Sequence, residues 1–226
     1  MRKLNRYGKT QGQIYRTLFL IYLGIAIIIG VSGFGAYKIL KPKYQAYKER
    51  KELEELEAIA KAEQEEKERI AQQEEKMRKA IEGGTAWNGH TYKVFEDGMN
   101  WEDAKLYCED IGGHLVIIES QEEQTMLESI LGEKNFYWLG ASIELGKTDS
   151  TWWWVNGEHI DYSNWHGTQP DNFTGEETCL MMYNYPNPMD SSTVKGVWND
   201  AQNDGECNGE EFFGASNSGF ICEWDI

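Results

Sequence analysis

The four cysteines constrain this chain more than any other feature, because all of them lie between Cys108 and Cys222. An even number of cysteines in a compact segment indicates two disulfides, and four cysteines allow three different pairings. The close C-x2-C spacing of structural zinc sites does not occur among them. Because disulfides form in an oxidising compartment, we expect the cysteine-containing part of the chain to lie outside the cytoplasm.

Charge divides the chain at Glu82. Residues 1–82 carry 17 Lys and Arg against 12 Asp and Glu, whereas residues 83–226 carry 5 against 26. Such an acidic segment is a poor partner for nucleic acid and for anionic lipid headgroups, but it suits cations. We therefore expect no nucleic-acid partner, although the same charge is also typical of an ordinary soluble surface.

Residues 17–37 form a run of 21 residues without a charge, rich in Leu and Ile. A helix of this length, at ~1.5 Å per residue, spans a ~30 Å hydrocarbon core. We therefore predict a transmembrane helix at 17–37 after a cytoplasmic tail at 1–16. Lysines flank the other side of this run, so the cysteines decide the orientation and place the C-terminal part outside the cell membrane. A cleaved signal peptide is the alternative to this single-pass signal-anchor.

Residues 38–83 predict a charged helical stalk, because Glu, Lys, Gln and Ala dominate them. Glu precedes Lys or Arg by four residues at several places, as at Glu75 and Lys79, which is the favoured order. A coiled coil needs sustained apolar heptad positions, and Glu63 interrupts the heptad phase that Leu56 and Ile70 share. We expect a single helix that forms at most a weak homo-oligomer and ends at Gly83-Gly84.

Residues 84–226 mix short strand and helix patterns, which predicts an α+β domain. Asn100 can cap a helix from Trp101, and Ser120 with Glu123 forms a capping box for a second helix that reaches Leu131. Residues 163–196 read as one long loop, and loops of that length in compact domains are usually functional or disordered. A metal ion and a disulfide would explain how this loop stays ordered.

Side-chain oxygens gather in two stretches around this loop, each beside its own cysteine. They belong to Gln169, Asp171, Glu177, Asn199 and Asp200. Carboxylate and amide oxygens are the ligands of Ca²⁺, which takes ~6–8 of them. Turns also favour Asp, Asn and Pro without any metal, but two such stretches beside two cysteines favour a Ca²⁺ site.

These stretches resemble the C-type lectin-like domain in its galactose-type form. Residues 169–171 (Gln-Pro-Asp) resemble the long-loop motif of the family, and residues 198–200 (Trp-Asn-Asp) its second calcium motif. Residues 137–140 and 220–223 resemble its core signature and closing strand. The resemblance covers roughly 84–226 and implies two helices, two small antiparallel sheets, a long calcium-binding loop and two disulfides, Cys108–Cys222 and Cys179–Cys207.

The resemblance also implies roles at the site. Gln169 with Asp171, and Glu177 with Asn199, would each offer one amide and one acid to a sugar hydroxyl. The 169–170 peptide bond would be cis, and Phe173 would pack on the apolar face of galactose, unless its ring is tucked inward. A second cation would use Glu144, Asp149 and Asn172.

No arrangement typical of a catalytic site occurs in the sequence, so we expect a binding protein and not an enzyme. The first hypothesis is a membrane-anchored, Ca²⁺-dependent lectin that binds galactose or N-acetylgalactosamine on glycans or glycoproteins at the cell surface. The alternative is a protein-binding domain of the same fold, in which Ca²⁺ only shapes the loop. Residues 172–174 form an N-glycosylation acceptor inside the proposed site, which favours a host without that machinery, such as a bacterium.

Overall fold

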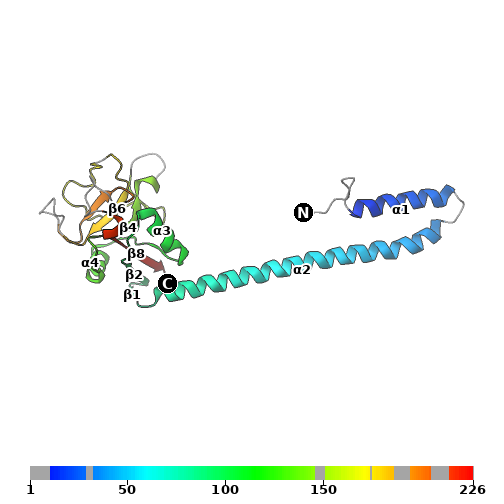
Figure 1. Cartoon of the computed structure of the whole chain (residues 1–226), viewed down its shortest axis with the longest axis horizontal. Coiled ribbons are helices and arrows are strands. Elements are labelled where there is room, and N and C mark those ends of the chain that lie inside the picture. The colour runs from blue at the N-terminus through cyan, green and yellow to red at the C-terminus, as the bar shows by residue number, and fades with distance from the viewer. Residues whose placement is uncertain are drawn as a thin grey trace. The chain divides into compact units, whose positions relative to one another are not determined.

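The computed structural model describes residues 11–28, 33–145, 151–173, 175–185, 194–204 and 214–225 (Figure 1). The chain divides into two compact units, Met1–Arg69 and Ile70–Ile226. The helices are α1 (Gln11–Ile28), α2 (Gly33–Ile81), α3 (Trp101–Asp110) and α4 (Gln121–Ile130), with single 3₁₀ turns at Ile143–Leu145 and Ala215–Asn217. The strands are β1 (Thr85–Trp87), β2 (His90–Phe95), β3 (His114–Leu115), β4 (Phe136–Ser142), β5 (Trp153–Trp154), β6 (Cys179–Tyr183), β7 (Trp198–Ala201) and β8 (Ser218–Asp225).

The N-terminal part differs from the single helix predicted at 17–37. It forms two helices, because α1 ends at Ile28 and α2 begins at Gly33, while residues 29–32 lie outside the described residues. The division falls in a stretch with three glycines and a serine between 30 and 35, which have low helix propensity. Across the described ranges, no helix combines the length and the apolar character that crossing a bilayer requires.

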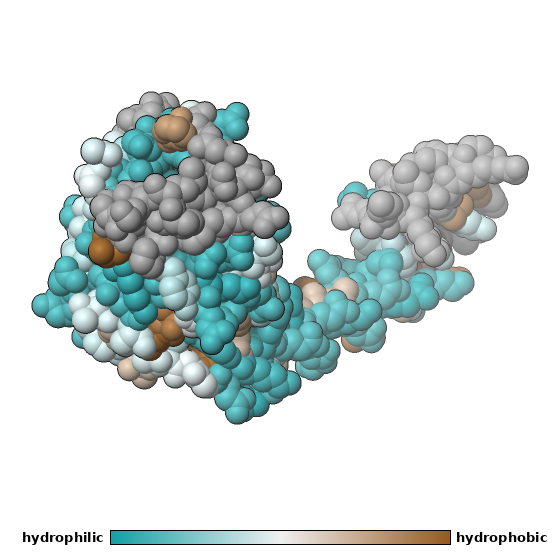
Figure 2. Space-filling view, turned by 60° about the vertical axis from the view of Figure 1, so that its left-hand side comes forward, coloured by the Kyte–Doolittle hydropathy of each residue, from teal (hydrophilic) through white to brown (hydrophobic). Residues whose placement is uncertain are grey.

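The charged segment forms one continuous helix, as the composition of residues 38–83 predicts. α2 spans 49 residues and continues through Pro42, where one backbone hydrogen bond is missing. Its ion pairs are local and exposed; the predicted pair between Glu75 and Lys79 is present at 3.3 Å, and others run in the reverse order, as between Lys48 and Glu52. The visible surface of α2 is mostly hydrophilic with isolated apolar side chains (Figure 2).

The last turns of α2 belong to the globular unit, which spans Ile70–Ile226. The boundary at residue 84 stays a prediction. Met77, Ala80 and Ile81 pack against its core. The Lys93 ammonium donates to the carbonyls of Ala80 at 2.7 Å and Glu82 at 2.8 Å, so a basic side chain satisfies carbonyls at the helix end. Gly83 then adopts φ 79°, which ends the helix as predicted.

Among the described residues, eight strands join into one hydrogen-bonded sheet. The two small antiparallel sheets implied by the resemblance stay a prediction. The order is β1-β2-β8-β4-β6-β7, with β3 paired to β8 and β5 paired to β4. The pairing of β4 with β8 is parallel and aligns Trp138 with Phe220. Parallel strands need a long crossover, and no local sequence pattern identifies such a distant pairing.

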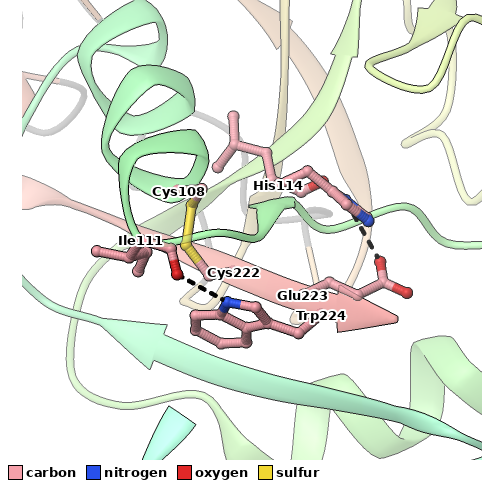
Figure 3. The surroundings of a disulfide bond; sticks show 7 residues. Cys108, Ile111, His114, Cys222, Glu223 and Trp224 are labelled. Carbon is pink, nitrogen blue, oxygen red and sulfur yellow. Dashed lines mark hydrogen bonds and ion pairs between the residues drawn. A yellow bond between two sulfur atoms is a disulfide. The ribbon is translucent and has the colours of Figure 1, made fainter. Parts of the chain in front are cut away.

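Buried side chains cover both faces of this sheet. Along β4, Phe136 and Trp138 enter one core cluster and Tyr137 and Leu139 enter the other, as strand alternation requires. All seven residues of β4 are buried. The predicted disulfide Cys108–Cys222 is present, with Cα atoms 5.7 Å apart, and it joins α3 to β8 (Figure 3).

The predicted helix starts are confirmed with one difference. The Asn100 side chain accepts a hydrogen bond from the Asp103 amide at 2.7 Å, and the Ser120 hydroxyl accepts one from the Glu123 amide at 3.2 Å. The Glu123 carboxylate does not complete the predicted capping box at Ser120. It accepts instead from the Glu119 amide at 2.9 Å, because its other oxygen accepts from a buried tyrosine hydroxyl on β2.

Candidate functional site

The candidate site lies where the loop that precedes β6 meets β7. Asn199 and Asp200 are buried residues of β7, which pairs with β6. Trp165 of the loop forms a β-bridge with Trp198 at the start of β7. The Trp198 ring is fully buried, and its indole N–H donates to the Gln124 side chain of α4 at 2.9 Å. A rigid strand therefore supplies one half of the site and fixes the loop that supplies the other.

A sharp turn places the first loop residues over Asp200. The bond between Gln169 and Pro170 is cis, which confirms the prediction. The Asp171 amide donates to Gln169 Oε1 at 3.0 Å and to Asp200 Oδ1 at 3.3 Å, and the Asn172 amide donates to Asp200 Oδ2 at 2.7 Å. Asp200, predicted only as a ligand of the cation, therefore also holds the backbone of this loop.

Glu177 closes the turn from its other end. Its carboxylate accepts the Phe173 amide at 2.7 Å, and its own amide donates to Asn172 Oδ1 at 3.0 Å. Asn172 adopts φ 47°, which asparagine tolerates better than most residues. Side chains of this loop therefore bond the backbone of the same loop, which holds Glu177 against β7 while Phe173 stays at the surface.

Three carboxylates meet between these two halves. Ligand oxygens of Asp171, Glu177 and Asp200 all lie within 4.8 Å of one another, with Asp171 exposed and the other two buried. The pKa of the Asp200 carboxyl lies above its ordinary value, mainly because the group is buried. The backbone N–H groups of Asn172, Asp200 and Asp171 lower this pKa, and the nearby Asp171 charge raises it. Carboxylates held this close repel one another, and a divalent cation offsets that repulsion. These three carboxylates are oxygen donors of the kind that Ca²⁺ takes.

A model of the lectin C-type domain matches residues 97–211, just over half of the chain. The chain belongs to the C-type lectin domain family. C-type lectin domain family 4 member G of Mus musculus is 32% identical over 139 residues, which cover 61% of this chain and 40% of that protein. The chain thus matches less than half the length of this relative. The perlucin-like protein of Mytilus galloprovincialis is 32% identical over 145 residues, which cover 62% of this chain and 80% of that protein.

A solved structure of the mouse scavenger receptor C-type lectin carbohydrate-recognition domain aligns at 32% identity. The alignment covers 62% of this chain and 92% of that one, with a TM-score of 0.48. Membership of the family makes the globular unit a lectin domain of the C-type.

The residues predicted for a second cation, and Phe173, do not belong to the three-carboxylate cluster. Glu144 is exposed and belongs to neither of the metal-ligand clusters found among the described residues, and Asp149 lies outside them. Asn172 bonds Glu177 within the loop. The second cation site therefore stays a prediction. The Phe173 ring is 69% exposed, so the alternative of a ring tucked inward is wrong.

Cys179 begins β6 next to the loop. It is a buried free thiol in this structure, and burial raises its pKa to about 12. Its expected partner Cys207 lies outside the described residues, so the second disulfide of the lectin domain stays a prediction.

Proposed function

We propose that the lectin domain binds galactose-type sugars in a Ca²⁺-dependent manner. One observation carries the proposal. Asp171, Glu177 and Asp200 converge within 4.8 Å beside a cis Gln169–Pro170 bond. Three acid side chains thus meet at one point, and the exposed Asp171 leaves that point open to a hydrophilic ligand.

The residues divide into two pairs with the same chemistry. Gln169 and Asp171 form one amide and acid pair, and Glu177 and Asn199 form the other. In each pair the carboxylate accepts the proton of a sugar hydroxyl and the amide N–H₂ donates to its oxygen, so each hydroxyl finds both partners. Ca²⁺ supplies the positive charge that draws the lone pairs of both hydroxyls, and Asp200 adds negative charge for the ion.

The order of residues in the first pair favours galactose over mannose. The chain places the amide at Gln169 and the acid at Asp171, which directs donor and acceptor to fixed sides of the hydroxyl. Galactose presents hydroxyls 3 and 4 as an equatorial and axial pair, whereas mannose presents both as equatorial. An unmatched donor or acceptor costs ~1–3 kcal/mol, roughly a five- to hundredfold preference. The exposed Phe173 ring offers a surface for the apolar face of galactose.

Anchoring at the cell membrane is the second part of the proposal. The uncharged residues 17–37 support it, with residues 1–16 inside and the lectin domain outside, where its disulfide can form. Protease added to intact cells should then remove the lectin domain and leave the N-terminus protected. Protection of the lectin domain would overturn this topology.

Sugar binding with and without calcium tests the main proposal. We expect binding to immobilised galactose or N-acetylgalactosamine in millimolar Ca²⁺, loss of binding in EDTA, and weaker binding to mannose. The double change Gln169→Glu with Asp171→Asn keeps the charge, so Ca²⁺ should still bind while preference moves toward mannose. Phe173→Ala should weaken the binding of galactose and leave the mannose binding of the double variant largely unchanged. If the unmodified protein binds no sugar in saturating Ca²⁺, the protein-binding alternative replaces this proposal.

A further inference from the structure

Two histidines and two carboxylates gather at the end of the sheet, on strands other than those of the sugar site. His90 begins β2 and lies opposite Asp225 of β8, while His114 begins β3 and lies opposite Glu223 of β8. Glu223 and Asp225 are two residues apart in the same strand, so their side chains share one face of the sheet. Three strands that are distant in sequence thus bring their polar side chains to one point.

The distances within this cluster suit metal ligands. The His90 Nδ1 atom lies 2.8 Å from Asp225 Oδ1 and 2.9 Å from Glu223 Oε1, and His114 Nε2 lies 3.6 Å from Asp225 Oδ2. Ligand atoms of His90, Glu223 and Asp225 all lie within 4.8 Å of one another. Zn²⁺ binds imidazole nitrogen and carboxylate oxygen at ~2.0–2.2 Å in a tetrahedral arrangement, which separates neighbouring ligand atoms by distances of this order.

Backbone groups already orient two of these side chains. The His114 Nδ1 atom lies 2.9 Å from the Leu115 carbonyl, so Nδ1–H donates there and Nε2 turns its lone pair toward Asp225. Glu223 Oε2 accepts a hydrogen bond from the Ile117 amide at 2.9 Å, which leaves Oε1 on the side of His90. Figure 3 shows His114 turned toward the Glu223 carboxylate. Supporting bonds of this kind are what fix the ring and the tautomer of a metal-bound histidine.

Hydrogen bonding alone does not satisfy the cluster. One imidazole nitrogen carries either one proton or one lone pair, yet His90 Nδ1 has a carboxylate oxygen within 3 Å on each of two residues. A single N–H divided between the two oxygens bonds each of them only weakly and still leaves two carboxylates beside each other. A cation between the nitrogen and both oxygens meets all three at once. We propose that His90, Glu223 and Asp225 bind a divalent transition-metal ion of the zinc type, with His114 as the adjacent fourth donor.

The ligand types separate this site from the sugar site. Two imidazole nitrogens favour a borderline ion such as Zn²⁺, whereas Ca²⁺ takes oxygen ligands. The Glu223 side chain is 5% exposed, while His90 is 33%, His114 25% and Asp225 67% exposed. The site therefore has one buried carboxylate and an open side through which an ion enters without unfolding. A bound ion clamps β2 and β3 to β8, as Cys108–Cys222 clamps α3 to β8.

Titration of Zn²⁺ into the full chain without a histidine tag, in detergent and saturating Ca²⁺, tests the proposal by calorimetry. We expect one Zn²⁺ per chain and a higher melting temperature. The double variant His90→Gln/His114→Gln should lose at least about tenfold in affinity, since even supporting partners are worth that much. His159→Gln removes an exposed histidine elsewhere and should bind Zn²⁺ normally, and so should Asp200→Asn of the sugar site.

Three outcomes overturn the proposal: no saturable binding, equal affinity in the double variant and in His159→Gln, or loss of binding in Asp200→Asn. Near-UV circular dichroism checks that the double variant keeps its fold. If the double variant loses its fold, the visible absorption spectrum of Co²⁺ added to the unmodified protein tests the site instead. Co²⁺ in a four-coordinate site of nitrogen and oxygen ligands absorbs strongly in the visible range. A Co²⁺ spectrum no stronger than that of the aqueous ion then refutes the site.

Discussion

The first unit and the globular unit differ in how far apart in the sequence their contacting residues lie. In α2 up to Arg69, ion pairs join residues three or four apart, and both Lys48 and Glu52 are about 60% exposed (63% and 60%). In the unit from Ile70 onward, a disulfide joins residues 114 apart in sequence, and the buried Trp198 bonds a side chain 74 residues away.

This difference predicts different responses to mutation. Local, exposed contacts each add little, and the helix loses them one at a time. Long-range buried contacts form together, so one change in the globular unit weakens many of them. The predictions that follow test this contrast, from the largest expected effect to the smallest.

Removing the disulfide should give the largest effect. Cys108→Ser with Cys222→Ser opens a loop of 114 residues, which costs ~4–5 kcal/mol by chain entropy. We expect the tryptophan signals of the globular unit in near-UV circular dichroism to disappear near body temperature, while the helical far-UV signal of α2 persists. Loss of both signals in one transition would show that the two regions are not independent.

Calcium should stabilise only the globular unit. An ion that binds only the folded state, at a concentration of a hundred times its Kd, adds ~2.7 kcal/mol to the free energy of unfolding. Asp200→Asn should abolish most of the Ca²⁺-dependent rise in melting temperature, because this buried carboxylate belongs to the cluster. Asp161→Asn, a change to an exposed acid outside the cluster, should leave that rise intact. If millimolar Ca²⁺ does not change the melting temperature of the unmodified protein, the proposed Ca²⁺ site is wrong.

One helix should respond differently at its two ends. Met77 of α2 packs half-buried against the globular core, so Met77→Ala should cost ~1–2 kcal/mol. Leu56, 63% exposed on the same helix, should cost no more than ~0.5 kcal/mol when changed to Ala. Denaturant unfolding followed by tryptophan fluorescence compares the two. Equal costs would refute the assignment of the last turns of α2 to the globular unit.

Salt should have the smallest effect and should act on α2. Raising NaCl from 0.1 M to 1 M shortens the Debye length from ~10 Å to ~3 Å and screens the exposed ion pairs. We expect a slight loss of the 222 nm signal at constant temperature, with little change in the tryptophan signals. A large cooperative loss at high salt would instead indicate that charges hold α2 in a packed assembly.

Local patterns predicted those parts of the molecule that depend on neighbours in sequence. Asn100 and Ser120 cap their helices as expected, and Gly83 ends α2. The lectin motifs also identified the three carboxylates and the cis bond before Pro170. Local patterns did not predict the parallel pairing of β4 with β8, because it depends on chain segments about eighty residues apart.

The sequence by itself predicted the three carboxylates that meet at the candidate site, since a ligand set follows from residue type and motif order. Only the tertiary structure decided that Asp200 also holds the amides of Asp171 and Asn172, and that Phe173 stays exposed. It alone brought the histidines of β2 and β3 to the carboxylates of β8. The physical reason is that sheet register sets which side chains share a face, and register results from packing across the whole domain.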